Sequence, residues 1–244
     1  KGKRGGPRSK PPYPPTSGLW KKPTVINNVE TLSSIPSIIL KGADWFNKIG
    51  LSESSGTKVL TLLGDVKKQG AVEVPLGTNL KDIIYNIGGG IIEGKKLKMV
   101  QLGGPSGSCL TPDMIDIALD YKVLSQAGLT LGSGVALVLC EDRCIVDIVR
   151  NIAHFFQHES CGKCTPCREG TKIIYHLLTK IALGKGEDID LETLKSLGET
   201  MKDTSFCGLG QSAPNSLLNT LKLFPEEYKQ HIQKKDCPLK VCRG

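Results

Sequence analysis

The sequence has few aromatic residues, no long apolar run and no signal peptide. Aromatic side chains make up 5% of the 244 residues. No apolar stretch approaches the roughly 20 residues that a membrane-spanning helix needs. The chain does not begin with Met, and it opens on a basic, proline-rich segment rather than an apolar one. We therefore expect no direct membrane insertion, and we expect the chain to be a piece of a longer polypeptide.

The excess of positive charge does not indicate nucleic-acid binding. The chain has 32 basic and 24 acidic residues, which gives a net charge of +8, and part of this excess lies in the first ten positions. No nucleic-acid-binding motif is present, and aromatic residues are few. An anionic dinucleotide or an acidic partner subunit accounts for the charge equally well. We predict no nucleic-acid partner.

Three cysteines at intervals of three residues form the most informative motif, Cys161, Cys164 and Cys167. This spacing lets three thiolates bind three irons of a [4Fe–4S] cluster, and the fourth thiolate must come from elsewhere. Cys207 is its expected source. A disulfide framework suits a small secreted chain rather than this one with nine cysteines, and structural zinc sites usually pair two C-x-x-C knuckles. We predict a [4Fe–4S] cluster, in a reducing compartment such as the cytosol.

The first part of the chain is predicted to be mostly irregular. Its prolines disfavour regular structure over residues 1–23. Tyr13, Leu19 and Trp20 are large apolar groups that a free linker rarely carries. We therefore expect an ordered, extended loop packed on another domain. A helix is predicted to follow over residues 29–40.

From Gly56 the pattern is that of a small β-rich domain. Strands are predicted over residues 57–63, 71–74, 97–102 and 135–140. Thr78 is predicted to be the N-cap of a helix over residues 80–87. This order of elements resembles a β-grasp domain. The glycine triplets fit neither the Walker nor the dinucleotide fingerprint, so we interpret them as turn glycines.

From Cys144 onward the apolar residues recur at the period of a helix. We predict a bundle of four helices, over residues 145–158, 166–184 and 190–202 and from Ser212 or Asn215 onward. Thr165 and Asp190 are the predicted N-caps of the second and third helices. The predicted buried faces include Phe155 in the first helix and Ile173 in the second.

The cysteine loop lies between the first two predicted helices. A cluster with four thiolates is anionic, so the positive end of the second helix favours it. His154 and His158 lie four residues apart, but no glutamate stands between them in the zinc-protease arrangement, and we predict packing and surface roles. His176 and His231 stand alone and carry no metal-site signal.

These motifs resemble those of one protein family. The residues that carry the resemblance are 10–20, 22–31, 159–170 and 205–207. They resemble the NADH-binding flavoprotein subunit of respiratory complex I, and the diaphorase subunits of NAD(P)-linked iron hydrogenases, including electron-bifurcating ones, and of formate dehydrogenases. The resemblance implies an α+β fold in four parts: the end of a Rossmann-like FMN/NADH domain (1–55), a β-grasp (SLBB-like) domain (56–142), a four-helix [4Fe–4S] domain (143–235) and the start of a cysteine-containing extension (236–244).

The resemblance also implies site residues. Cys161, Cys164, Cys167 and Cys207 match the family's cluster ligands. Asn27, Asn28 and Thr31 match the segment that lines FMN, with Asn27 or Asn28 as the direct contact; the alternative for these asparagines is to cap a turn. The glycine-rich nucleotide-binding segment of the family is absent here. The chain alone is therefore not expected to oxidise NADH, whereas its parent binds FMN and NAD(H).

The implied function is electron transfer. A hydride passes from NADH to FMN, and single electrons pass to the [4Fe–4S] cluster and on to partner iron–sulfur subunits, or in reverse. By resemblance these partners are a thioredoxin-like [2Fe–2S] subunit and a larger multi-cluster subunit, in a cytoplasmic or peripheral assembly. The resemblance leaves open whether the assembly is a hydrogenase, a formate dehydrogenase or a respiratory complex. It also leaves open whether the cofactor is NADH or NADPH. A second function class is a non-redox structural or assembly module whose metal only holds the bundle.

The last residues carry two more cysteines, Cys237 and Cys242. They resemble the start of the extension in soluble hydrogenase-type subunits, which carries further clusters, and Cys144 recurs in that branch. A second metal site of Cys237, Cys242 and either Cys144 or a histidine, suited to zinc, is one hypothesis. Free thiols in a mobile tail are the alternative.

Overall fold

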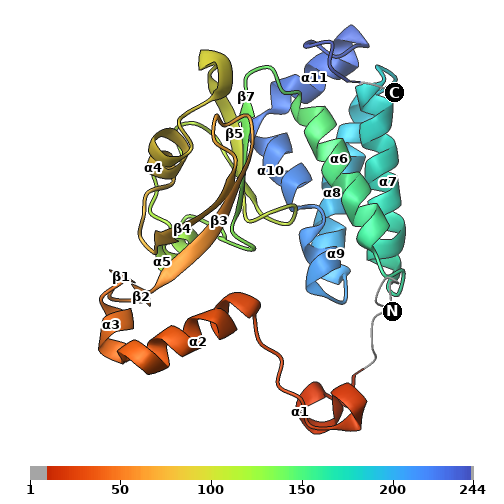
Figure 1. Ribbon diagram of the computed structural model, residues 1–244. Coiled ribbons are helices and arrows are strands. Elements are labelled where there is room, and N and C mark those ends of the chain that lie inside the picture. The colour runs from red at the N-terminus through yellow and green to blue at the C-terminus, as the bar shows by residue number, and fades with distance from the viewer. Residues whose placement is uncertain (1–9, 243–244) are drawn as a thin grey trace. The chain divides into compact units, whose positions relative to one another are not determined.

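The computed structural model of the protein describes residues 10–242, which divide into two compact units between Gly56 and Thr57. Figure 1 shows the order of the elements along the chain. None of the helices in the described part is long and apolar enough to cross a membrane.

The first unit is mainly helical. Its elements are α1 (Pro14–Ser17), a 3-10 turn η1 (Leu19–Lys21), α2 (Val29–Lys41), α3 (Ala43–Asn47) and two short strands, β1 (Gly50–Leu51) and β2 (Ser54–Ser55). The helix predicted over residues 29–40 is confirmed.

The extended loop predicted over residues 1–23 is wrong where the structure describes it. Pro14 and Pro15 begin the helical turn α1, since proline is tolerated in a first turn, where its missing N–H leaves no bond unmade. Within the chain the side chain of Trp20 is 84% exposed. The part of this prediction that concerns residues 1–9 lies outside the described residues.

The second unit begins with a five-stranded sheet in the order β4-β3-β7-β5-β6. The strands are β3 (Thr57–Gly64), β4 (Gly70–Pro75), β5 (Leu97–Leu102), β6 (Ser108–Leu110) and β7 (Val135–Cys140). The strand β7 is central; it pairs with β3 in parallel, and the other pairs are antiparallel. A helical segment between β4 and β5 completes the β-grasp arrangement that the sequence predicts.

That helical segment has a different N-cap from the one predicted. It consists of α4 (Leu80–Asp82) and the π turn η2 (Ile83–Ile87). Asn79, not Thr78, is the N-cap, because the Asn79 side chain accepts a hydrogen bond from the N–H of Lys81 at 2.9 Å. The Thr78 hydroxyl instead donates to the carbonyl of Pro75 at 2.7 Å. The strand β6 and the helix α5 (Tyr121–Gln126) were not predicted.

The strands β5 and β7 are apolar and largely buried on both faces of the sheet. Successive side chains of a strand point to opposite faces, so Val100 and Val138 pack into a core shared with α4 and α5. Met99 and Leu139 pack into a second core shared with the helices from α6 onward. The sheet therefore lies between α4 and the helical bundle (Figure 1).

The bundle has more helices than predicted. They are α6 (Ile145–Glu159), α7 (Thr165–Ala182), α8 (Asp188–Thr204), α9 (Gly208–Ser212), α10 (Asn215–Leu223) and α11 (Pro225–Lys234). The four predicted helices correspond to α6, α7, α8 and α10. The helices α9 and α11 were missed, and both carry residues of the candidate sites or lie against them.

Some local predictions for the bundle are wrong. Cys164, not Thr165, is the N-cap of α7. Asp190 lies inside α8 and accepts the backbone N–H of Glu187, the true N-cap, at 2.8 Å. The side chains of Phe155 and Ile173 are exposed rather than buried, because the buried stripes of α6 and α7 are rotated away from them.

Candidate metal centres

The cysteine loop lies between α6 and α7, at the end of the bundle where α9 begins (Figure 1). Its turn needs Gly162, whose φ of +76° favours glycine. The guanidinium of Arg168 donates to the Gly162 carbonyl at 2.9 Å and so fixes the loop against the first turn of α7. Cys167 lies in that first turn, where the N–H groups of the helix favour negative charge.

Cys207 joins the three loop cysteines. Burial raises the pKa of the Cys167 thiol, a hydrogen bond with Ser160 opposes this, and the charges of Cys164, Cys207 and Cys161 raise it further. The backbone of Phe206, the neighbour of Cys207, donates a hydrogen bond to Cys164, and Gly210 of α9 packs against the Cβ of Cys167, so Cys207 lies beside the loop. The structure thus brings together the four residues predicted to bind the cluster, and their role as ligands stays a prediction.

The four loop-site cysteines are not the group of described residues whose ligand atoms are close enough to hold a single metal ion. Among residues 10–242, the one group of His, Cys, Asp or Glu side chains whose ligand atoms all lie within 4.8 Å is a different one. A cubane of four irons is larger than one ion, so its ligands need not lie as close together as those of a single ion. Cys164 and Cys167 are buried, whereas Cys161 and Cys207 are exposed. A hydrogen bond from the Phe206 backbone is the main cause that lowers the pKa of Cys164.

The surroundings of Cys167 also fit a bound cluster. The Ser205 hydroxyl is buried without a hydrogen-bond partner among the described residues. A side chain at Gly210 would come within 2.9 Å of the Cys167 Cβ, so only glycine leaves room there. A buried hydroxyl without a partner is rare in proteins and points to an additional acceptor. The thiolate donors, the space left at Gly210 and the unpaired Ser205 hydroxyl all fit the [4Fe–4S] cluster that the sequence predicts.

The second candidate centre consists of Cys144, His231, Cys237 and Cys242. The Sγ atom of Cys144 lies 3.3 Å from Nε2 of His231 and 3.5 Å from Sγ of Cys242. A tetrahedral zinc ion holds sulfur and nitrogen ligands roughly 3.5 Å apart. The spacing therefore suits one zinc ion. The structure brings the three predicted cysteines together, and it identifies the histidine as His231, for which the sequence carries no metal-site signal.

The side chains of this second centre shift one another's pKa values. A hydrogen bond from Cys242 is the largest cause that lowers the pKa of Cys144 to about 4, and burial opposes it. Burial is the largest single effect on His231 and disfavours its protonated form, but the interactions with Cys144, the Glu227 carbonyl and Cys237 together outweigh it and raise the pKa of His231 to about 9. A thiolate beside an imidazolium suits a cation site, because metal binding requires the thiolate and takes the place of the imidazolium proton.

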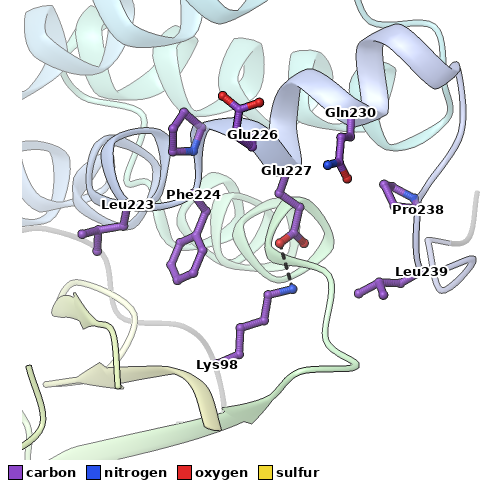
Figure 2. Close-up of a pocket in the computed structure, with 9 residues that line it drawn as sticks. Lys98, Leu223, Phe224, Glu226, Glu227, Gln230, Pro238 and Leu239 are labelled. Carbon is purple, nitrogen blue, oxygen red and sulfur yellow. Dashed lines mark ion pairs between the residues drawn. The ribbon is translucent and has the colours of Figure 1, made fainter. Parts of the chain in front are cut away.

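A buried ion pair supports this centre from the side of the sheet (Figure 2). Glu227 of α11 pairs with Lys98 of β5 at 2.8 Å, and both side chains are largely buried. The other carboxylate oxygen of Glu227 accepts the N–H of Ile145, the first residue of α6, at 2.7 Å. The Glu227 carbonyl also faces Nδ1 of His231 at 2.7 Å. A hydrogen bond at Nδ1 leaves Nε2 directed at the sulfurs, as in ligating histidines.

A cavity of about 360 Å³ lies beside this ion pair. Its lining is mainly apolar and includes Phe224 of the α10–α11 junction and Pro238 and Leu239 of the tail (Figure 2). Lys98 and Glu227 form its charged edge. The tail that carries Cys237 and Cys242 is thus packed next to the ion pair rather than free.

The predicted flavin residues lie in the first unit. Asn27, Asn28 and Thr31 are exposed, and the Asn28 side chain accepts the N–H of Glu30 at 2.7 Å. Asn28 therefore caps α2, which is the alternative role considered for it. A contact of Asn27, Asn28 or Thr31 with FMN stays a prediction.

The histidine pair of α6 has the packing and surface roles expected of it. His154 stacks on Tyr175 of α7, with ring centroids 4.9 Å apart. His158 is exposed and lies 3.2 Å from the carboxylate of Glu159. Neither belongs to the one group of close ligand atoms found in the described residues.

A cysteine loop with cubane spacing, carried by a helical bundle on a β-grasp sheet, defines an iron–sulfur module. Sequence comparison agrees with this class. Residues 147–231 match the NADH-ubiquinone oxidoreductase-F iron-sulfur binding region, and residues 59–109 match the SLBB domain.

Whole-chain comparisons extend the match. The chain is 49% identical over 241 residues to the HndC subunit of the NADP-reducing hydrogenase of Solidesulfovibrio fructosivorans, which covers 99% of this chain and 49% of the relative. It is 42% identical over 237 residues to the F 2 subunit of the NADH-quinone oxidoreductase of Rhizobium meliloti (strain 1021), covering 97% of this chain and 56% of the relative. The crystal structure of NAD+-reducing [NiFe]-hydrogenase in the H2-reduced state matches with a TM-score of 0.80 and 37% identity, covering 95% of this chain and 38% of that chain.

Over nearly its whole length the chain is therefore homologous to NADH-quinone oxidoreductase F subunits and to the hydrogenase subunit HndC. The resemblance and the fold class predicted from the sequence are confirmed. The chain spans about half the length of the curated relatives that it matches.

Proposed function

We propose that this chain is the electron-transfer part of an NADH-oxidising or NAD(P)-reducing flavoprotein subunit. Cys161, Cys164, Cys167 and Cys207 are the four ligands of its [4Fe–4S] cluster. When bound, such a cluster supplies one-electron transfer between a flavin and a further iron–sulfur centre. The protein holds two of the sulfurs in its interior and leaves Cys161 and Cys207 at the surface, toward a partner.

One observation carries this proposal. The four cysteines come together at one end of a bundle, and the cluster loop lies within the stretch that matches an iron–sulfur binding region. The names of the relatives support an assembly of several subunits, of the hydrogenase type or the complex I type.

The longer parent polypeptide is the proposed site of FMN and NAD(H) binding. Asn27, Asn28 and Thr31 are the residues of this chain that we assign to the flavin, with Asn27 as the direct contact because Asn28 already caps α2. The proposed partners are a thioredoxin-like [2Fe–2S] subunit and a larger multi-cluster subunit in the cytoplasm. Either NADH or NADPH is compatible with this chain.

The second centre is proposed to bind one zinc ion that holds the tail to the bundle. Three sulfurs and one imidazole nitrogen within 4.8 Å of one another support this role. Such a set fills all four positions of zinc and leaves none for a substrate, which is typical of a structural site.

An anaerobic preparation of the chain tests the main proposal. We expect about four irons and four sulfides per chain and an EPR signal on reduction. Cys207→Ser should remove the EPR signal or change its form. Cys140→Ser, at a buried thiol of β7 outside both centres, is the matched control and should keep the iron.

The competing function is a structural or assembly module without redox activity. A chain that contains zinc but no iron, and whose visible absorption does not bleach with dithionite, would support that function and reject electron transfer.

A further inference from the structure

The Ser205 hydroxyl has no hydrogen-bond partner within the described residues. Ser205 is 4% exposed and ends α8, where its N–H donates to the carbonyl of Met201. Its own carbonyl accepts the side-chain amide of Gln211 at 3.0 Å. Only the hydroxyl is left unpaired, and a buried hydroxyl without a partner is costly.

This hydroxyl lies against the buried side of the cysteine site. The point at which a Cβ of residue 210 would lie is 2.7 Å from Ser205 Oγ and 2.9 Å from Cys167 Cβ. Both atoms lie this close to one point, so the hydroxyl and the Cys167 side chain are neighbours across Gly210. Ser205 also precedes Cys207 by two residues. The hydroxyl is therefore buried beside the place where a cluster bound by Cys167 and Cys207 would lie.

A second serine approaches Cys167 from the loop between α6 and α7. Ser160 Oγ lies 3.3 Å from Cys167 Sγ. The N–H of Gly162 donates to Ser160 Oγ at 3.3 Å and so occupies one of its lone pairs. When Cys167 is an iron-bound thiolate it can only accept, so the Ser160 hydroxyl must be the donor.

We propose that Ser160 and Ser205 are positioning residues whose hydroxyl hydrogens point at the sulfurs on the Cys167 side of the cluster and raise its reduction potential. This inference rests on the proposed cluster ligands and assigns two residues that contribute no iron ligand. Reduction adds negative charge to the sulfurs. Donors that face them stabilise the reduced form more than the oxidised form, and hydrogen bonds to sulfur are a known determinant of cluster potential.

The test is a redox titration of the full chain, prepared anaerobically and followed by EPR. Ser160→Ala and Ser205→Ala should each shift the midpoint potential of the cluster to a more negative value, at unchanged iron content. Ser160→Thr keeps the hydroxyl and should return the potential to that of the unchanged chain. Ser212→Ala is the matched control, because the Ser212 hydroxyl lies on α9 but donates to the carbonyl of Gly208 at 2.6 Å.

Two outcomes are distinguishable. If the unchanged chain does not hold about four irons, the proposed function fails first. If it does, and Ser160→Ala keeps both its iron and its potential, the inference is overturned. Ser160 is only half-buried, so its variant decides the question whether or not Ser205→Ala retains the cluster.

Discussion

The Sγ atom of Cys144 lies 3.3 Å from Nε2 of His231, although the two residues are 87 positions apart in the sequence. Cys144 precedes the first residue of α6, and His231 lies in the last turn of α11. The contact therefore joins the first helix of the bundle to the last one. Cys237 and Cys242 add the tail to the same point.

Removing metal from this centre should destabilise the bundle without removing iron. Binding to the native state alone stabilises it by about 4 kcal/mol when free zinc is roughly 1,000 times the dissociation constant. Cys144→Ser and His231→Asn should each lose about one zinc per chain and lower the melting temperature, as measured by elemental analysis and calorimetry. Cys109→Ala, at a buried thiol outside both centres, should keep zinc and iron. Equal zinc content in all three variants would reject the site.

Loss of the Glu227 carboxylate should weaken zinc binding even though Glu227 is not a ligand. It ties the first amide of α6 to α11 and to Lys98, and so sets the distance between Cys144 and His231. Removing a group that orients a ligand typically costs 10- to 100-fold in metal affinity, so we expect Glu227→Ala to release zinc to a chelator about ten times faster. Glu226→Ala is the control, because Glu226 is exposed on the same helix, where it pairs with Lys229. Identical release rates would show that the ion pair does not support the centre.

Acid should break the contact between Asp65 and Arg143. Asp65 is 1% exposed, and the hydrogen bonds from Arg143 are the main cause that lowers its pKa from 3.8 to about 2. A folded-state pKa below the unfolded one means that the carboxylate stabilises the native state above about pH 4 and loses this effect as the pH falls toward 2. The shift corresponds to about 2 kcal/mol.

Urea denaturation of Asp65→Asn over this pH range checks the expectation. The variant should be about 2 kcal/mol less stable at pH 7, and the difference should shrink as the pH falls below 4. Asp116→Asn, at an exposed ion pair with Lys81, should change stability by less than about 0.5 kcal/mol. A difference for Asp65→Asn that does not vary with pH would contradict this account.

Two glycines that end helices should respond differently to alanine. Gly128 and Gly184 both have a left-handed φ, of +69° and +71°. Alanine at Gly128 would meet no atom within 4 Å, so only the backbone cost of about 1–2 kcal/mol applies. Alanine at Gly184 would overlap the carbonyl oxygen of Lys235, which precedes the tail cysteines. Gly184→Ala should therefore cost about 1–3 kcal/mol more and also release zinc faster. Equal stabilities, measured by urea denaturation, would show that the tail adjusts freely.

The sequence allowed most of the sheet and the long helices to be predicted, since their apolar periods are strong. The strands over residues 97–102 and 135–140 are confirmed with the same bounds. Both are largely buried on two faces, so their apolar runs are nearly continuous and their ends are marked by glycines and charged residues. The first residue of a helix was harder to predict. Thr78 and Asn79 are both favoured N-cap residue types, and only the backbone geometry selects Asn79.

His231 was missed because α11 has little apolar periodicity. Most of Pro225–Lys234 is polar, and only Tyr228, His231 and Ile232 are buried. A different signal was present: Pro225 at the first position, acidic residues in the first turn and Lys234 in the last turn are typical of a helix. Even so, the approach of α11 to Cys144 depends on packing across the whole bundle, and no local pattern reports it.

The helix α6 carries Cys144 at its start and ends just before Cys161. Its 15 residues separate the two centres by about 22 Å along a rigid rod. Whichever centre fills first fixes one end of this helix and lowers the entropy that the other must lose on filling. Loading of zinc and of the cluster should therefore be positively cooperative, with each metal raising the affinity for the other by the same factor.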